Sequence, residues 1–275
     1  MPKELRSALL QGGIVTGLMA LALVIGCLLI PGHTEIPEDA TTAPAPAPTI
    51  APNPYTMDDF QYENGFLSCS AGKTVTGIDV SHHQQVIDWQ QVKAAGIEFA
   101  FIRLGYRGYS DGLLNEDRYA ADNLRGAKEA GLKIGAYFFS QAVSVEEAQE
   151  EARYALQLLG DTALDLPLVY DWEYINETAR TAFVSARTLT DCTIAFCETV
   201  KNAGQTPMIY FNQSQARDKL YLQELTGYQW WLAMYDIAMD FPYQIHIWQY
   251  TSTGTVSGID GNVDVNLMFF YDETH

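Results

Sequence analysis

The sequence predicts an α/β fold in which about eight strands close into an irregular barrel with fewer helices than strands. Three observations predict it. Short apolar runs alternate with amphipathic stretches between residues 74 and 272, as in a mainly parallel sheet. About eight such runs fit into this range, which favours closure into a barrel. Helical stretches become scarce after Phe211, so loops should replace the later helices.

The strands are expected where apolar runs lie between turn-forming residues. They are placed at residues 75–80, 97–104, 132–140, 166–173, 206–211, 228–235, 244–251 and 263–270. In a barrel of this kind, functional residues gather at the carboxyl ends of the strands.

Helices are expected between the earlier strands, at residues 88–95, 118–130, 144–159 and 188–203. Ser144 followed by Glu147 forms a capping box that predicts the start of the third helix. Thr188 with Asp191 predicts the start of the fourth. Glycines end these stretches, because glycine readily adopts the left-handed conformation that closes a helix.

The composition excludes several classes of partner and site. The formal net charge is -18 over 275 residues, which argues against nucleic acid as a partner. The four cysteines are Cys27, Cys69, Cys192 and Cys197, and none has a metal-site spacing. We expect buried thiols, and a single bridge involving Cys69 stays open. His82 and His83 lack a further ligand at suitable spacing, so we expect no metal site there.

The N-terminal segment has the length and polarity of a membrane anchor. Residues 7–30 are uncharged and long enough to span a bilayer, after a short N-terminus at 1–6 that we expect to be cytoplasmic. Positive residues precede this segment and acidic ones follow it, which places the domain outside the membrane. The run before Cys27 also resembles a lipidation site. The alternatives are therefore a lipoprotein at Cys27 or a secreted protein, and all three export the domain.

The remaining boundaries follow from composition. Residues 31–54 read as a Pro/Ala-rich linker, which should be extended and semi-rigid. Residues 55–73 form an N-terminal extension of uncertain structure, and residues 74–272 form the barrel domain. We expect the protein to be monomeric.

The strongest chemical signal is the acid pair that ends the expected strand at 166–173. Asp171 and Glu173 are two positions apart, so a strand points both side chains to one face. Two neighbouring acids repel each other, so at least one should keep its proton near neutral pH and act as a proton donor. Paired carboxyl groups of this type point to glycoside hydrolysis.

Five motifs occur in order along the domain, at 77–81, 171–173, 231–235, 247–251 and 261–266. Together they resemble the family 25 glycoside hydrolases, lysozymes that cut peptidoglycan between N-acetylmuramic acid and N-acetylglucosamine. The resemblance covers residues 74–270. It implies a TIM-like (β/α) barrel and glycan strands of peptidoglycan as the substrate. We expect no cofactor, and the missing ligand spacing predicts no metal.

The resemblance also implies roles for single residues. Glu173 corresponds to the general acid and Asp171 to the neighbouring carboxylate, in retaining chemistry that can use the 2-acetamido group of the substrate as nucleophile. Asp79 and Asp264 correspond to further acids, and the second catalytic carboxylate stays open among these. The sugar groove is expected to contain Tyr137, Tyr210, Trp231, Tyr235, Trp248 and Gln249.

Other interpretations remain at this point. Trp231 and Trp248 are as compatible with the core as with the groove, and Arg103 should be a buried partner of a site acid. The domain could be a catalytically silent glycan-binding scaffold, which the intact acid pair disfavours. A chitinase-like hydrolase is the third alternative, although its longer series of aspartates is missing before Glu173.

Overall fold

The structure is a computed structural model that describes residues 49–235 and 239–271. The expected N-terminus at 1–6, the expected membrane segment at 7–30 and the expected linker up to residue 48 lie outside the described residues. Within the described ranges, no helix is both long enough and apolar enough to cross a membrane. All described residues belong to one compact unit of the chain, residues 46–275.

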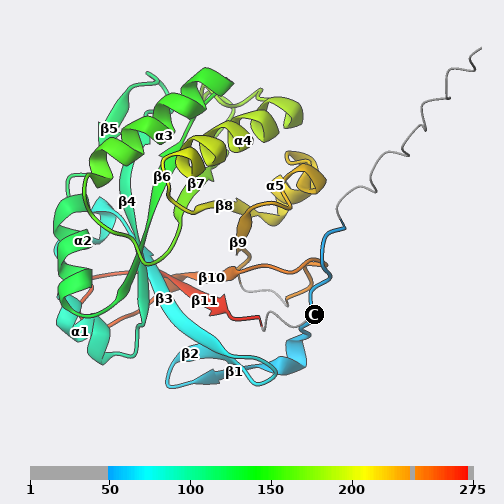
Figure 1. The fold of residues 1–275 in the computed structure, drawn as a ribbon. Coiled ribbons are helices and arrows are strands. Elements are labelled where there is room, and N and C mark those ends of the chain that lie inside the picture. Colours follow the sequence, from blue (N-terminus) through cyan, green and yellow to red (C-terminus); the bar gives the residue numbers. More distant parts are fainter. Residues whose placement is uncertain (1–48, 236–238, 272–275) are drawn as a thin grey trace, which may run out of the picture. The chain divides into compact units, whose positions relative to one another are not determined.

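Eight strands close into a barrel, as the alternating apolar runs predict (Figure 1). Around the barrel the order is β3, β11, β10, β9, β8, β7, β6 and β4, and β4 pairs with β3 to close it. Their bounds are β3 (Thr74–Val80), β4 (Phe99–Arg107), β6 (Lys133–Ser140), β7 (Leu168–Trp172), β8 (Pro207–Asn212), β9 (Gln229–Ala233), β10 (Ile247–Gly254) and β11 (Val263–Phe269). Only β11 runs antiparallel to its barrel neighbours, β10 and β3. The start of β11 therefore lies at the mouth where the other strands end.

The helices cover the outside of the first part of the barrel (Figure 1). They are α1 (Trp89–Ala94), α2 (Ala120–Glu129), α3 (Val145–Leu159), α4 (Ala186–Asn202) and the short α5 (Gln213–Asp218). Among the described residues no helix follows β9 or β10, which agrees with the expected scarcity of late helices. The start of α4 corrects the expectation at Thr188, because Ser185 is the N-cap and accepts the Thr188 N–H.

Strand alternation divides the apolar residues between two cores. Val169 on β7 lies in the barrel interior, in a cluster that also contains Phe101 and Trp231. Its neighbours Leu168 and Tyr170 face outward and belong to the larger cluster beneath the helices. Because side chains alternate along a strand, Asp171 points into the barrel like Val169 and lies one step nearer the mouth of the barrel.

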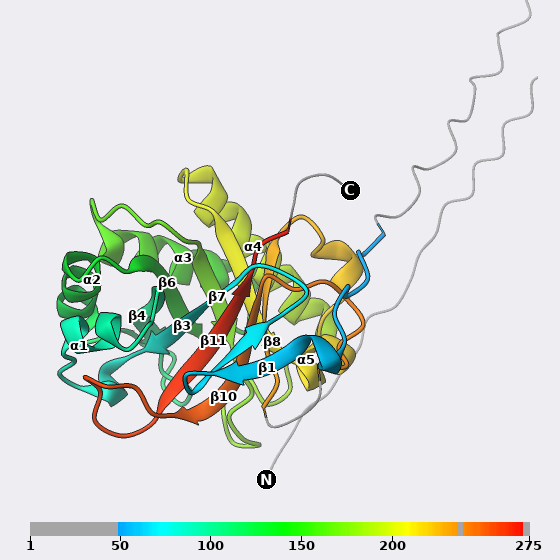
Figure 2. The ribbon, with the colours of Figure 1, turned by 90° about the horizontal axis from the view of Figure 1, so that it is seen from below.

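The N-terminal extension is a β-hairpin that packs where the barrel has no helices. Strands β1 (Phe60–Glu63) and β2 (Phe66–Cys69) pair antiparallel around Asn64 and Gly65, which both have positive φ. Phe60 packs edge-on against Trp248 of β10 at 5.2 Å, and Tyr55 stacks on Phe269 of β11 at 5.2 Å. Figure 2 shows β1 beside β11. The hairpin therefore buries aromatic side chains that a later helix would cover in a regular barrel.

Smaller elements complete the described unit. Strand β5 (Leu114–Glu116) pairs with the end of β4, and three 3-10 turns lie at Met57–Asp59, His82–Gln84 and Leu222–Glu224. Asn53, assigned from sequence to the linker, donates its backbone N–H to the Pro242 carbonyl at 2.9 Å, so this end of the expected linker lies on the barrel. Cys69, Cys192 and Cys197 are buried free thiols.

Candidate active site

A cleft with a volume of about 540 Å³ opens at the mouth of the barrel. It is lined by the four predicted acids together with five of the predicted groove residues, which are Tyr137, Tyr210, Trp231, Tyr235 and Gln249. The structure therefore brings together residues that lie almost 200 positions apart in the chain. These residues come from β3, β6, β7, β8, β9, β10 and β11 and the turns that follow them.

The antiparallel direction of β11 explains how Asp264 reaches the cleft. Asp264 and Asp79 are directly paired Cα partners between β11 and β3. Asp79 stands near the end of its strand and Asp264 near the start of the other, and opposite directions bring these two ends together. Both side chains line the cleft.

Asp79 is held by amide donors on neighbouring strands. The same oxygen, Oδ2, accepts hydrogen bonds from Gln249 Nε2 and Asn266 Nδ2, each at 2.8 Å. Trp231 Nε1 donates to Asn266 Oδ1 at 2.8 Å, and Tyr210 donates its hydroxyl to Gln249 Oε1 at 2.8 Å. Each amide is thus oriented by an aromatic donor, which fixes its NH₂ group toward Asp79.

The acid pair follows the pattern expected for the end of a strand. Asp171 lies within β7 and Glu173 directly after it, and both side chains line the cleft. Asp171 is 6 % exposed, and its Oδ1 is buried without a hydrogen-bond partner among the described residues. A buried carboxylate oxygen without a partner is costly, so it marks a position where a substrate donor can bind.

All four acids have raised pKa values, and burial is the largest cause for each. The pKa of Asp79 is raised from 3.8 to about 6, although two hydrogen bonds lower it. Burial and then the charge of Asp79 raise the pKa of Glu173 from 4.5 to about 7. Burial, Asp79 and Glu173 raise the pKa of Asp264 to about 8. Burial and then the charge of Glu173 raise the pKa of Asp171 well above 3.8. The cleft therefore retains carboxyl protons near neutral pH.

Two glutamines hold the backbone that carries the acid pair, and the sequence did not identify them. Gln141 Nε2 donates to the Glu173 carbonyl oxygen at 2.8 Å, and Gln215 Nε2 donates to the Trp172 carbonyl oxygen. Thr181 donates its hydroxyl to Gln141 Oε1 at 2.8 Å, which orients the carboxamide. Both glutamines are buried. No local pattern distinguishes them, because their contacts join residues far apart in sequence.

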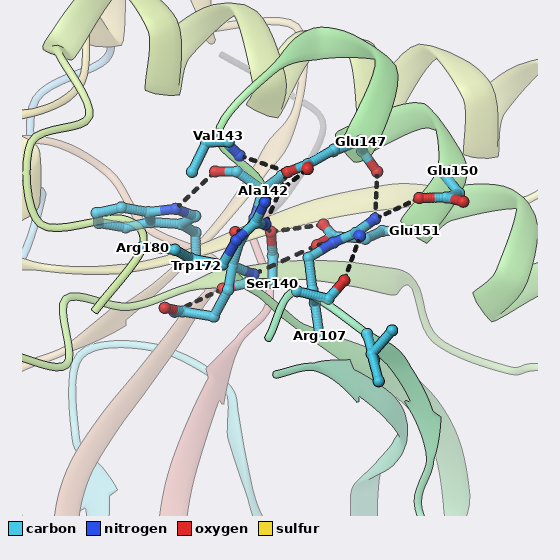
Figure 3. A network of polar contacts seen from close by, with 12 residues as sticks. Arg107, Ser140, Ala142, Val143, Glu147, Glu150, Glu151, Trp172 and Arg180 are labelled. Carbon is cyan, nitrogen blue, oxygen red and sulfur yellow. Dashed lines mark hydrogen bonds and ion pairs between the residues drawn. The ribbon is translucent and has the colours of Figure 1, made fainter. Parts of the chain in front are cut away.

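Next to Gln141, a partly buried ionic network ties α3 to the barrel (Figure 3). Arg107 at the end of β4 donates to Glu151 Oε1 at 2.7 Å, and Ser140 at the end of β6 donates to Glu151 Oε2 at 2.6 Å. Arg180, in the segment after β7, pairs with Glu147 at 2.6 Å. The network therefore links α3 to the strand ends and to the segment that follows Glu173.

One wall of the cleft carries basic rather than acidic side chains. Arg103 was expected to pair with a site acid, but its partner is Asp117, which accepts from Nε at 2.9 Å and from Nη2 at 2.8 Å. His82 and His83 also line this wall, which their sequence context did not reveal. Among the described residues, no group of three or more His, Cys, Asp or Glu side chains has the geometry of a metal site.

Trp248 is the one predicted groove residue that the structure places elsewhere. Its indole Nε1 donates to the Met234 carbonyl oxygen at 2.8 Å, and its ring packs in the outer core. The physical reason is strand alternation: Gln249 faces the interior, so the adjacent Trp248 must face outward. The expectation that Trp248 lines the cleft is therefore corrected.

Known proteins share both the sequence pattern and the fold. The model of the family described as glycosyl hydrolases family 25 matches residues 78–259. The chain is 32% identical over 215 residues to the protein YegX of Escherichia coli (strain K12), covering 72% of this chain and 70% of that one. It is 27% identical over 289 residues to lysozyme M1 of Streptomyces globisporus, covering 94% of this chain and 90% of that protein.

Solved structures of a bacterial autolysin and a bacterial lysozyme have a fold similar to that of this chain. The modular autolysin LytC of Streptococcus pneumoniae superimposes with a TM-score of 0.63 at 27% identity, covering 71% of this chain and 47% of that one. This chain thus corresponds to about half of LytC, which has also been solved with a synthetic peptidoglycan ligand. The bacterial lysozyme of Streptomyces coelicolor superimposes with a TM-score of 0.58 at 28% identity, covering 72% of this chain and 93% of that one.

Proposed function

This chain belongs to glycosyl hydrolase family 25, and from that premise we propose that its cleft cuts peptidoglycan strands between N-acetylmuramic acid and N-acetylglucosamine. Family membership makes the chain a glycoside hydrolase. The observation that carries the proposal is the gathering of four carboxyl groups from β3, β7 and β11 at one open mouth. The relatives named as lysozymes support peptidoglycan as the substrate.

Glu173 acts as the general acid. A pKa of about 7 keeps a large share of this side chain protonated at neutral pH, yet leaves the proton easy to transfer. Glu173 then protonates the oxygen of the scissile bond as the bond to the sugar breaks. Gln141, bonded to the Glu173 carbonyl oxygen, limits movement of the backbone that carries this proton donor.

Asp171 supports retaining chemistry in which the 2-acetamido group of the substrate attacks its own sugar carbon. The acetamido N–H becomes more acidic as the carbonyl oxygen attacks, and a nearby carboxylate oxygen stabilises the developing positive charge. Asp171 Oδ1 has no hydrogen-bond partner among the described residues and can accept that N–H, and the positive charge that develops there favours the ionised form of Asp171 despite its raised pKa. Asp79 and Asp264 contribute negative potential around the same centre when they are ionised.

Product analysis tests this function. Residues 49–275 should lower the turbidity of a cell-wall suspension and release fragments whose new reducing ends are N-acetylmuramic acid. Glu173→Gln should abolish cleavage and leave the fold intact. The matched control is Glu177→Gln, which changes an exposed acid four positions further along. New ends at N-acetylglucosamine, binding without products, or full activity of Glu173→Gln would each contradict the proposal.

The N-terminal segment supports a location at the outer face of a cell membrane. Residues 7–30 are uncharged, basic residues precede them and acidic residues follow. In this proposal residues 7–30 anchor the chain as a single-pass helix and the linker holds the domain near the wall. After cell fractionation the protein should remain in the membrane pellet during a salt wash, and recovery from the medium would contradict the anchor.

A further inference from the structure

The basic wall of the cleft has the features of a preformed binding site. This wall is defined here by His82, His83, Arg103 and Tyr106, which lie on β4 and on the turn after β3. Arg103 is the one Lys or Arg among the described residues that line the cleft. In a chain with 34 acidic and 16 basic residues, a single buried arginine beside four acids calls for a physical explanation.

Asp117 fixes the orientation of Arg103. Its Oδ2 accepts from Arg103 Nε at 2.9 Å, from Arg103 Nη2 at 2.8 Å and from the His82 N–H at 2.9 Å. Its Oδ1 accepts the Tyr119 N–H at 3.0 Å. The Asp117 side chain is fully buried, and these bonds lower its pKa despite burial, so it stays ionised. Because both its oxygens are bonded, Asp117 serves as a rigid support for the guanidinium.

This arrangement leaves one edge of the guanidinium for a ligand. Arg103 is 8 % exposed and lies 5.3 Å from the centre of the Tyr106 ring. Nε and Nη2 donate to Asp117, whereas Nη1 donates to none of the described residues. A guanidinium presents its donors in a plane, in a geometry that matches a carboxylate. Arg103 is therefore a buried cation at the wall of the cleft, and its Nη1 group can still donate hydrogen bonds to a ligand.

His82 adds a second donor to the same wall. Its Nδ1 is in close contact with Arg103 Nη2, and Asp117 Oδ2 lies 3.3 Å from the same atom. The guanidinium can only donate, so the closer contact makes Nδ1 an acceptor and leaves the ring proton on Nε2. Burial, as the largest cause, and the charge of Arg103 lower the pKa of the adjacent His83. The wall thus offers N–H donors and one permanent positive charge.

Peptide-free strands of the substrate in the proposed function carry a group that this wall can bind. Where the peptide has been removed, the lactyl ether of N-acetylmuramic acid ends in a free carboxylate, which N-acetylglucosamine lacks. The four acids would repel a carboxylate placed beside them, whereas the basic wall attracts it. We propose that Arg103, held by Asp117, binds the free lactyl carboxylate and so favours peptide-free stretches of the glycan strand. This inference rests on the proposed function, because it concerns the same cleft.

A second role for Arg103 makes a different prediction. The charge of Arg103 lowers the pKa of Asp171, although burial and the other acids outweigh it. If Arg103 served only this electrostatic role, its loss would affect every substrate equally and would shift the pH profile. If Arg103 binds the lactyl carboxyl, its loss affects only substrates that carry this group. Comparing two matched polymers therefore separates the roles.

The test combines enzyme variants with a chemically altered substrate. Peptide-free glycan strands are prepared with free lactyl carboxylates, and half are treated so that these carboxyl groups are reduced to alcohols. The ratio of kcat/KM for the two polymers is measured for the wild type, for Arg103→Lys and for Arg103→Gln combined with Asp117→Asn. The double variant removes both charges, so that no unpaired charge is left buried. Arg125→Gln, which breaks an exposed Arg–Asp pair on α2, is the control.

The wild type and the Arg125→Gln control should prefer the carboxylate polymer by about tenfold, as expected for a charge-assisted hydrogen bond. In the double variant this ratio should fall toward one, mainly through KM, whereas Arg103→Lys should keep part of the preference because it keeps the positive charge. An unchanged ratio in the double variant, or a wild type without preference, would overturn the role of Arg103 while leaving the proposed function standing. A wild type that cleaves neither polymer would overturn the proposed function, and this inference with it.

Discussion

Replacing Asp79 by asparagine tests how the charge of Asp79 affects the pKa of the proton donor Glu173. Asp79 is 7 % exposed, and its charge contributes to the raised pKa of Glu173. Gln249 and Asn266 both donate to the same Asp79 oxygen. The carbonyl oxygen of asparagine can accept both bonds, so Asp79→Asn removes a charge with little change in shape.

The size of the effect follows from the pKa values. Glu173 is raised from 4.5 to about 7, with burial as the larger cause and Asp79 as the second. Asp79 itself has a pKa of about 6, so it is charged in the range where Glu173 titrates. A neighbouring charge of this kind shifts a pKa by roughly one unit, or about 1.4 kcal/mol. We expect the pKa of Glu173 to fall by about one unit in Asp79→Asn.

The assay is the pH dependence of kcat/KM on soluble peptidoglycan fragments. A general acid must be protonated, so its pKa sets the alkaline limb of the profile. That limb should move to lower pH by about one unit in Asp79→Asn, whatever happens to the maximal rate. Asp260→Asn, at an exposed position before β11, should leave the limb in place. A limb that stays fixed or moves to higher pH in Asp79→Asn would refute this electrostatic reasoning.

Three further predictions follow from the same structure. Because the folded pKa values of Asp79, Glu173 and Asp264 lie above their ordinary values, the folded state holds protons that the unfolded state releases. The free energy of unfolding should therefore fall as pH rises from about 4 to about 8, with Glu173 alone accounting for about 3 kcal/mol. Urea unfolding at both ends of this range checks it, and a stability that rises with pH would contradict it. A chain that begins at residue 74 loses the hairpin and exposes the outer faces of β10 and β11. Its Tm should therefore drop well below that of a chain that begins at residue 49. Equal Tm values would show that the hairpin is dispensable. Gln141→Met removes the donor to the Glu173 carbonyl oxygen, and kcat should fall by about tenfold with KM unchanged. An unchanged kcat would rule out a positioning role.

The strands and the acid pair could be predicted because their signals are local. Alternation along a strand and the caps of the helices are read within a few residues, and Asp171 and Glu173 end such a run. The hairpin at 60–69 has a local signal as well, since Asn64-Gly65 is typical of a tight turn between strands. Its short flanking strands and their acidic neighbours obscured that signal.

Other features depend on how the barrel closes. The position of Asp264 at the mouth requires β11 to run antiparallel, which its own residues do not encode. Trp248 and Gln249 cannot both face the cleft, and only the register of β10 decides between them. Asp117 and Gln141 act through contacts with segments distant in sequence, so one sequence gives no reason to select them.

The most direct measurement is a crystal structure of Glu173→Gln with a peptidoglycan tetrasaccharide bound across the cleft. The scissile oxygen should lie within hydrogen-bond distance of the side chain at position 173, with the acetamido N–H directed at Asp171 Oδ1. A sugar chain seated on another face of the domain, or a scissile oxygen out of reach of that side chain, would contradict the convergence of acids around the proton donor.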